Sequence, residues 1–241
     1  MRNALLIARR EIGSYLGSPV GYVVAAVALL IQGLWFTFLG LTKGALLSAQ
    51  VLGVFFEGAS GTTIILAALL SMRLLAGERE NGTMVLLNTA PVRESEVVAG
   101  KFLAGLSFLT AVAALTVYMP LLIFVNGKVS IGHILVGYLG IVLLAAASLA
   151  VGLFASALAS SQVVAVLIAG ALLGVLFLVF FVAQATEPPI NTFLFGLSIF
   201  HVRQRGFMTG VLKLENVVYY VGVAYFFLFA TTKTLEARRW R

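Results

Sequence analysis

The sequence is poor in charged and reactive side chains. It has no cysteine and no aspartate, and charged residues make up only 10% of its 241 residues. The absence of cysteine excludes disulfide bonds and leaves the redox compartment undefined. The absence of aspartate excludes an aspartyl intramembrane protease. It also disfavours ion coupling through buried carboxylates, because only nine glutamates remain and most of them lie at the ends of apolar stretches.

Motifs for catalysis are missing as well. The nearest approach to the nucleotide-binding pattern G-x-x-x-x-G-K-[ST] ends in Gly100-Lys101, where Ser95 replaces the first glycine and Phe102 replaces the hydroxyl residue. There is no G-x-S-x-G serine elbow. The two histidines are far apart in sequence and have no partners at metal-ligand spacing. We therefore predict that this chain is not an enzyme and has no catalytic, cofactor-binding or metal-binding residue.

The sequence is rich in long apolar stretches. Hydrophobic residues make up 61% of the chain and the mean hydropathy is +1.07, which indicates a polytopic membrane protein. The length leaves room for about six spans of ~20 residues and for no soluble domain. We predict an all-α fold in one transmembrane domain, residues 1–241, with spans near 20–41, 52–75, 102–125, 133–158, 163–183 and 217–232.

We predict two further elements outside these spans, one before the first span and one between the last two. Apolar residues at helical spacing in 1–19, with Arg9 and Arg10 able to reach headgroups, predict an interfacial elbow helix that Pro19 ends. The long connection 185–216 contains an apolar run, 190–200, that is too short to span and is flanked by charge, which predicts a re-entrant or surface helix. The fourth span is rich in small residues, so we expect it inside the bundle.

Some polar residues within the spans are candidates to face a substrate pathway, although such hydroxyls more often serve helix packing. They are Gln32, Thr62, Thr63, Thr110, Thr116 and Ser148.

The segment 72–101 concentrates charge between the second and third spans. Gly82 can end the helix that arrives from the second span, and Thr83 can cap a new helix through its hydroxyl. That helix must be short, because Pro91 cannot lie in its interior and suits the first turn of the next helix. Its apolar residues, Leu86 and Leu87 among them, lie outside the predicted spans, so burial in lipid does not explain them. We therefore predict a surface that a soluble partner contacts.

The same segment resembles the cytosolic coupling segment of type-two ABC exporter permeases. The run M-R-x-x-x-x-E-R-x-x-G-T leads to L-L-x-T-x-P and then to G-K, and it is most similar to permeases of the gliding-motility and nitrous-oxide-reductase-maturation subgroup. The resemblance extends to residues 9–22, 138–164 and 238–241. Two positions depart from the pattern: the family often has a proline where this chain has Ser71, and a second acid where it has Gly77.

The resemblance implies a permease, typically of an exporter, that couples through 77–101 to a separate ATPase. ATP and Mg would then be bound by the ATPase subunits. Further expected partners are a second copy or a related permease, an extracytoplasmic accessory subunit, and the lipid bilayer of a bacterial inner membrane. The alternative is a non-transporting membrane scaffold or channel subunit, for which the segment would be an ordinary solvated loop. The residues assigned to coupling are Arg73, Glu78, Arg79, Glu80, Gly82, Thr83, Met84, Leu86, Leu87, Pro91 and Lys101.

The distribution of basic residues predicts the orientation. With both termini in the cytoplasm, eleven lysines and arginines lie inside and five lie outside. The net charge of +7 is scattered over the ends of the spans, which suits anionic headgroups and not a nucleic acid partner.

Overall fold

The computed structural model describes residues 2–41, 47–82, 92–127 and 129–239, and within these ranges it contains helices and no strand. The elements are α1 Arg2–Gly17, α2 Pro19–Trp35, the π-helical turn η1 Phe36–Leu41, α3 Ser48–Leu74, α4 Ala76–Glu80, α6 Glu94–Leu115, α7 Tyr118–Asn126, α8 Ile131–Leu158, α9 Gln162–Gln184, α10 Ile190–Leu197, α11 Arg203–Met208 and α12 Leu214–Arg239.

In the part of the chain that the structure describes, six helical segments are long and apolar enough to cross a bilayer. They are Gly21–Leu41, Ser48–Glu80, Glu94–Val125, Ile131–Leu158, Gln162–Gln184 and Leu214–Arg238. This confirms the predicted all-α, polytopic membrane fold.

The fourth span, α8, forms the centre of the bundle. It packs against α3, α9 and α12, and a continuous stretch of its small residues is buried. The close contacts depend on glycine: a methyl group on Gly137 would lie 2.1 Å from the ring of Phe56, and one on Gly140 would lie 2.5 Å from the Cβ of Phe207. The predicted central position of this span is confirmed.

Two prolines set the bends of the chain. Pro19 begins α2 directly after α1, as predicted, and the turn is tight enough that a methyl group on Gly21 would lie 2.2 Å from the carbonyl oxygen of Tyr15. The third span is divided into α6 and α7 at Thr116, four residues before Pro120. Proline cannot donate to the carbonyl four residues earlier and its ring clashes with it, so the helix is interrupted there.

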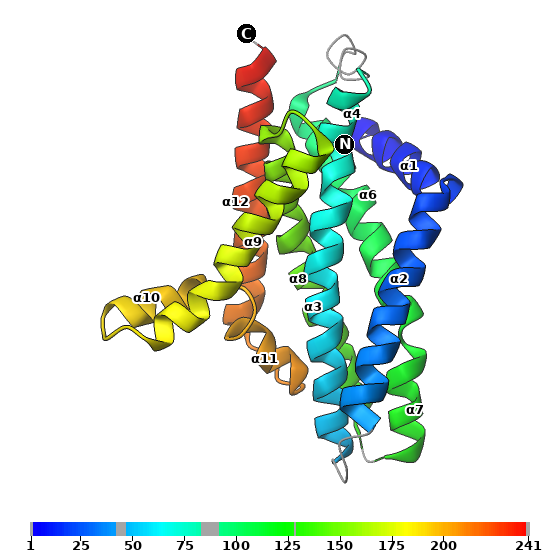
Figure 1. Cartoon of the computed structure of the whole chain (residues 1–241), viewed down its shortest axis with the longest axis vertical. Coiled ribbons are helices and arrows are strands. Elements are labelled where there is room, and N and C mark those ends of the chain that lie inside the picture. The colour runs from blue at the N-terminus through cyan, green and yellow to red at the C-terminus, as the bar shows by residue number, and fades with distance from the viewer. Residues whose placement is uncertain (1, 42–46, 83–91, 128, 240–241) are drawn as a thin grey trace.

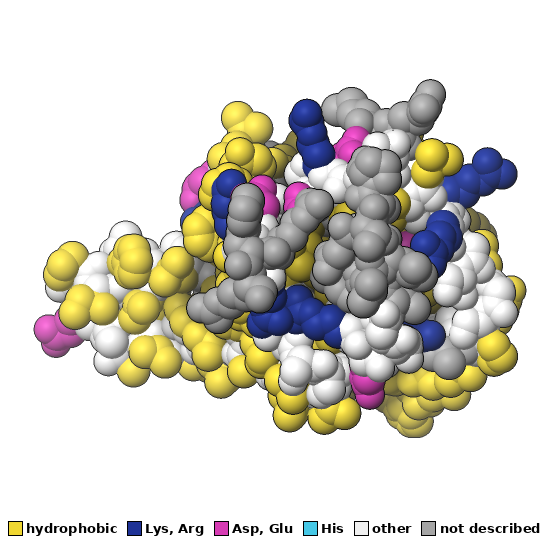
Figure 2. Space-filling view, turned by 90° about the horizontal axis from the view of Figure 1, so that it is seen from above, with side chains coloured by type: hydrophobic (Ala, Val, Ile, Leu, Met, Phe, Trp, Pro, Cys, Tyr) yellow, Lys and Arg dark blue, Asp and Glu magenta, His cyan; other side chains and the backbone are white. Residues whose placement is uncertain are grey.

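The two ends of the bundle differ. We call the end formed by α1, α4 and the last turns of α12 the charged end, and the end formed by η1 and α7 the far end. Both chain termini lie at the charged end (Figure 1). Figure 2 looks onto it and shows lysine, arginine and glutamate side chains gathered over the bundle, beside a projecting arm that is mostly hydrophobic.

The projecting arm contains α10, which lies against α9 and buries none of its residues. The helix is shorter than the predicted apolar run, because it ends at Leu197 and the chain then turns into α11. Both short helices lie between the levels of the two ends and do not reach the far end (Figure 1). That this connection is a re-entrant or surface helix stays a prediction.

Candidate functional site

The charged end is built around an interruption between α3 and α4. The backbone N–H groups of Leu75 and Ala76 donate to the hydroxyl of the buried Ser156 in α8, at 3.2 and 2.9 Å. α3 and α8 approach closely here because Gly152 of α8 faces Ser71 of α3. A methyl group on Gly152 would lie 2.4 Å from the Ser71 hydroxyl. The serine that departs from the family pattern therefore lies at a helix contact.

Two charged residues of α4 clamp the turn between α8 and α9. The Arg79 guanidinium donates to the carbonyl oxygen of Ala159 at 2.5 Å, and the Glu80 carboxylate accepts from the backbone N–H of Gln162 at 3.1 Å. A cation thus meets the carbonyl end of α8 and an anion meets the amide end of α9, which is the favourable sign at each helix end. A second guanidinium, from Arg238 in α12, donates to the carbonyl of Leu158 at 2.7 Å.

Lys101 joins three elements of the charged end. Its ammonium group lies 2.8 Å from Glu11 in α1 and 2.7 Å from Glu78 in α4, and its side chain is only 1% exposed. A buried ammonium is costly unless it is paired and hydrogen-bonded, so the two glutamates are what permit its burial. The G-K pair therefore acts structurally: a methyl group on Gly100 would lie 2.7 Å from the carbonyl oxygen of Ala4, so glycine allows α1 to lie on α6.

The helix boundaries around the charged segment are partly as predicted. Gly82 has a positive φ of +71° after α4 ends, which confirms its predicted role. Glu94 and Glu96 lie in the first turn of α6, also as predicted. α6 begins at Glu94 after an extended Arg93 whose N–H donates to the Glu96 carboxylate at 3.5 Å. Pro91, predicted for the first turn of the next helix, lies outside the described residues.

The elbow helix α1 is fixed to α6 and presents charge outward. Asn3 donates to Glu96 at 3.0 Å, and Tyr15 packs against Phe108 with ring centroids 5.4 Å apart. Arg9 and Arg10 are exposed, which is compatible with the predicted headgroup contacts.

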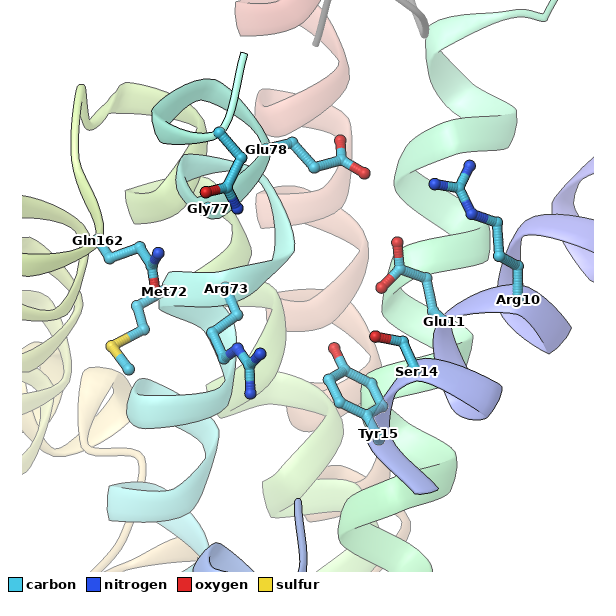
Figure 3. Close-up of a pocket in the computed structure, with 10 residues that line it drawn as sticks. Arg10, Glu11, Ser14, Tyr15, Met72, Arg73, Gly77, Glu78 and Gln162 are labelled. Atoms are coloured by element: carbon cyan, nitrogen blue, oxygen red, sulfur yellow. The ribbon is translucent and has the colours of Figure 1, made fainter. Parts of the chain in front are cut away.

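A cleft of about 500 Å³ separates α1 from the end of α3 and from α4. Figure 3 shows Arg73 and Glu78 on one wall and Glu11, Tyr15 and Arg10 on the facing wall. The full lining is Arg10, Glu11, Ser14, Tyr15, Met72, Arg73, Gly77, Glu78, Asn81 and Gln162. The cleft thus brings together four charged side chains, Arg10, Glu11, Arg73 and Glu78, from α1 and from the α3–α4 wall.

The predicted coupling residues fall into two groups. Arg73, Glu78, Arg79, Glu80 and Lys101 all lie at the charged end, where four of them make the contacts within the chain given above and Arg73 lines the cleft. The others, except for Gly82, lie outside the described residues: Thr83, Met84, Leu86, Leu87 and Pro91. The coupling role of both groups stays a prediction.

The sequence reasoning missed the partners of the coupling segment. Ser156 stands out in the sequence only as one of many small residues in a packed span, and Gln162 only as part of a turn. Glu11 stands out only as the single acid of the basic elbow helix, which does not indicate which cation it pairs with.

A buried polar network also fixes α11 within the bundle, between the levels of the two ends. Gln204 is fully buried, donates to the Ser60 hydroxyl of α3 at 3.0 Å and accepts from the Tyr220 hydroxyl of α12 at 3.1 Å. The same tyrosine hydroxyl lies 2.8 Å from the carbonyl oxygen of Ile199. His133 of α8 contacts the carbonyl of Met208 at 2.7 Å. The connection between the last two spans is therefore locked to three helices.

Four of the six candidate pathway residues surround one small cavity of about 30 Å³ between α2, α3, α6 and α8. They are Gln32, Thr62, Thr63 and Thr116. The hydroxyls of Thr62 and Thr63 donate to carbonyls of their own helix, at 2.9 and 2.7 Å. These contacts favour the helix-packing role over ligand binding.

The comparison with known families agrees with this architecture. Residues 38–208, more than half of the chain, match the family model described as ABC-2 family transporter protein. The matched range runs from the end of the first span to α11 and includes the charged segment. No curated protein matches the chain.

Proposed function

Because the chain belongs to the ABC-2 family of transporter proteins and is a membrane permease component, we propose that it forms half of the pathway of an ATP-driven exporter. The energy would come from a separate ATPase subunit that docks on the charged end. The observation that carries this proposal is the bracing of α4. This short helix is tied to α1 and α6 through Glu78 and Lys101, and to the α8–α9 turn through Arg79 and Glu80.

Such bracing is what a transmission element requires. The segment 83–91 follows α4 directly, and a push on it would be passed through hydrogen bonds and ion pairs to four other helices. Those contacts join the charged end to the central span α8 and to α9, which has few buried residues of its own. An ordinary solvated loop would not require the helix before it, α4, to be held by so many elements.

The connection between the last two spans offers a matching element on the other side of the bundle from the charged end. We propose that the network of Ser60, Gln204 and Tyr220 holds α11 in place on the exit side when the pathway is closed. The network consists of neutral hydrogen bonds, each worth about 1 kcal/mol net, so it can be broken and re-formed during a transport cycle.

One chain with six spans is expected to supply one half of the transporter. We predict that the intact complex contains two permease chains, identical or related, and two ATPase chains. The measurement is the mass of the complex purified with its ATPase from membranes. A stable, active assembly with a single permease chain would contradict the proposal and favour the scaffold or channel alternative.

Cysteine labelling tests the orientation, and the chain provides a cysteine-free background. Single cysteines at Gly44, Lys128 and Lys213 should react in intact cells with an impermeant thiol reagent. One at Asn88 should react only after the membrane is opened, because the charged end would face the cytoplasm. Labelling of Asn88→Cys in intact cells would contradict the proposed orientation.

A further inference from the structure

The cleft between α1 and the α3–α4 wall has features that the coupling role leaves unexplained. Its wall carries two guanidinium groups, Arg10 and Arg73. Neither makes a hydrogen bond or ion pair with another residue of the described part of the chain. An arginine presents five N–H donors in a planar fork that suits phosphate or carboxylate oxygens.

The balance of charge around the cleft favours an anion. Glu11 and Glu78 also line it, but both carboxylates are held by Lys101 at 2.8 and 2.7 Å. The cleft wall thus carries two arginines and two glutamates, and the glutamates share the charge of Lys101 behind the wall while neither arginine is paired with a described residue. A cationic ligand would have to displace Lys101 from its buried position, whereas an anionic ligand would meet donors that are already free.

Tyr15 adds an unused donor. Its side chain is 5% exposed and its hydroxyl has no hydrogen-bond partner within the described ranges, although the ring is held against Phe108. Burial raises the pKa of the Tyr15 phenol and the charge of Glu11 adds to the effect, so the hydroxyl keeps its proton at neutral pH. Buried hydroxyls are nearly always satisfied in folded proteins, so one without a partner at a cleft wall points to a missing acceptor. Figure 3 shows the Tyr15 and Arg73 side chains pointing into the space between the two walls.

The surroundings of the cleft indicate where the anion comes from. α1 also carries the exposed apolar side chains Leu5, Leu6 and Leu16, each more than half exposed. A helix with this pattern lies in the headgroup region with its apolar face toward the acyl chains. The cleft therefore lies at the level of the lipid phosphates, and at about 500 Å³ it is within the size range of ligand pockets.

We propose that this cleft binds the phosphodiester of an anionic phospholipid from the leaflet at the charged end. Arg73 and Arg10 provide the charge, and the Tyr15 hydroxyl provides a directional hydrogen bond. The lipid would fill the gap between the elbow helix and the α3–α4 wall, and so would stiffen the contact between α1 and the root of the charged segment. This inference concerns lipid binding by the permease alone and does not rest on the proposed transport function.

The test is native mass spectrometry of the full chain in detergent, titrated with phosphatidylglycerol or with phosphatidylcholine. We expect the unmodified protein to retain one phosphatidylglycerol in preference to phosphatidylcholine. Arg73→Gln should weaken retention about tenfold, the size expected for loss of a charge-assisted hydrogen bond. Arg73→Lys should retain part of the affinity, and Tyr15→Phe, which removes only the oxygen, should weaken it severalfold.

Arg9→Gln is the matched control. It removes the same charge from an exposed position of α1 that does not line the cleft, and we expect no loss of the retained lipid. Equal losses for Arg9→Gln and Arg73→Gln would mean that lipid is attracted only by the general surface charge, and would overturn the site. Displacement of the lipid by millimolar inorganic phosphate would assign the cleft to a soluble phosphate compound and overturn the lipid assignment.

Folding of each variant is checked by its thermal unfolding midpoint. If Arg73→Gln fails to fold, the comparison of Tyr15→Phe with the unmodified protein decides, and unchanged retention in Tyr15→Phe would overturn the proposal. No ATPase is present in these experiments, so a negative result would leave the proposed transport function intact.

Discussion

Lys101→Met is expected to destabilise the folded permease by about 3 kcal/mol. Removing one partner of a buried ion pair costs about 3–5 kcal/mol, because the other charge is left without compensation. Here Glu11 and Glu78 would both lose the lysine, but their side chains are 19% and 16% exposed. Water can reach them, so we expect the lower end of the range. The measurement is the thermal unfolding midpoint of the purified protein together with its yield from membranes.

A second lysine provides the control. Lys233 lies 2.6 Å from Glu236 one turn later in α12, and the two side chains are 57% and 40% exposed. Exposed pairs of this kind are worth at most about 1 kcal/mol, so Lys233→Met should leave the midpoint nearly unchanged. The two substitutions remove the same group from a lysine–glutamate pair and differ in burial.

The reason for the effect can be tested separately. Adding Glu11→Gln and Glu78→Gln to Lys101→Met removes the two carboxylate charges that face the lysine, and we expect the triple variant to recover a large part of the lost stability. If Lys101→Met behaved like Lys233→Met, the three-element ion pair would not hold α1, α4 and α6 together.

The second large effect concerns coupling to the ATPase. Leu87→Ala, or Leu86→Ala if the short helix is rotated, should weaken ATPase binding by ~2 kcal/mol or more, because apolar anchors dominate such interfaces. These residues face water in the isolated permease if the coupling prediction holds, so neither change should lower the amount of folded protein. The measurements are ATPase co-purification, transport-dependent phenotype and membrane yield.

Arg79→Ala is the informative comparison, because the structure assigns its side chain to the α8–α9 turn. The variant loses a charge-assisted hydrogen bond to the Ala159 carbonyl, worth about 1.5–3 kcal/mol. We expect that loss to appear in stability and yield, with a smaller effect on partner binding than Leu87→Ala. Full partner binding and activity in both leucine variants would show that the segment 83–91 is only a solvated connection.

The sequence alone determined those properties that depend on local composition. Runs of apolar residues identified the six candidate spans found among the described residues, because no other environment accommodates such lengths. Pro19 and Gly82 marked a bend and a helix end, because their backbone preferences act on their immediate neighbours. The transporter class was likewise recognisable from the residue pattern of the charged segment, because that pattern is contiguous in the chain.

The partners of the charged residues were beyond sequence reasoning. Lys101 could be seen as charged, but nothing in the sequence selected Glu11, 90 positions earlier, as its partner. The same holds for Arg79 with Ala159 and for Gln204 with Ser60. Lys101 and Arg79 were expected at the surface facing a partner protein, and both contact their own chain.

Only the tertiary structure decided these pairings, because they depend on how closely and at what rotation the helices pack. Gly100 and Gly152 allow approaches that a single methyl group would prevent, and each approach determines which polar groups meet. Hydropathy records that a helix is in the membrane and carries no information on which neighbour its polar residues face. The charged end is therefore recognisable from composition, whereas its network of contacts exists only once α1, α4, α6, α8 and α9 have packed together.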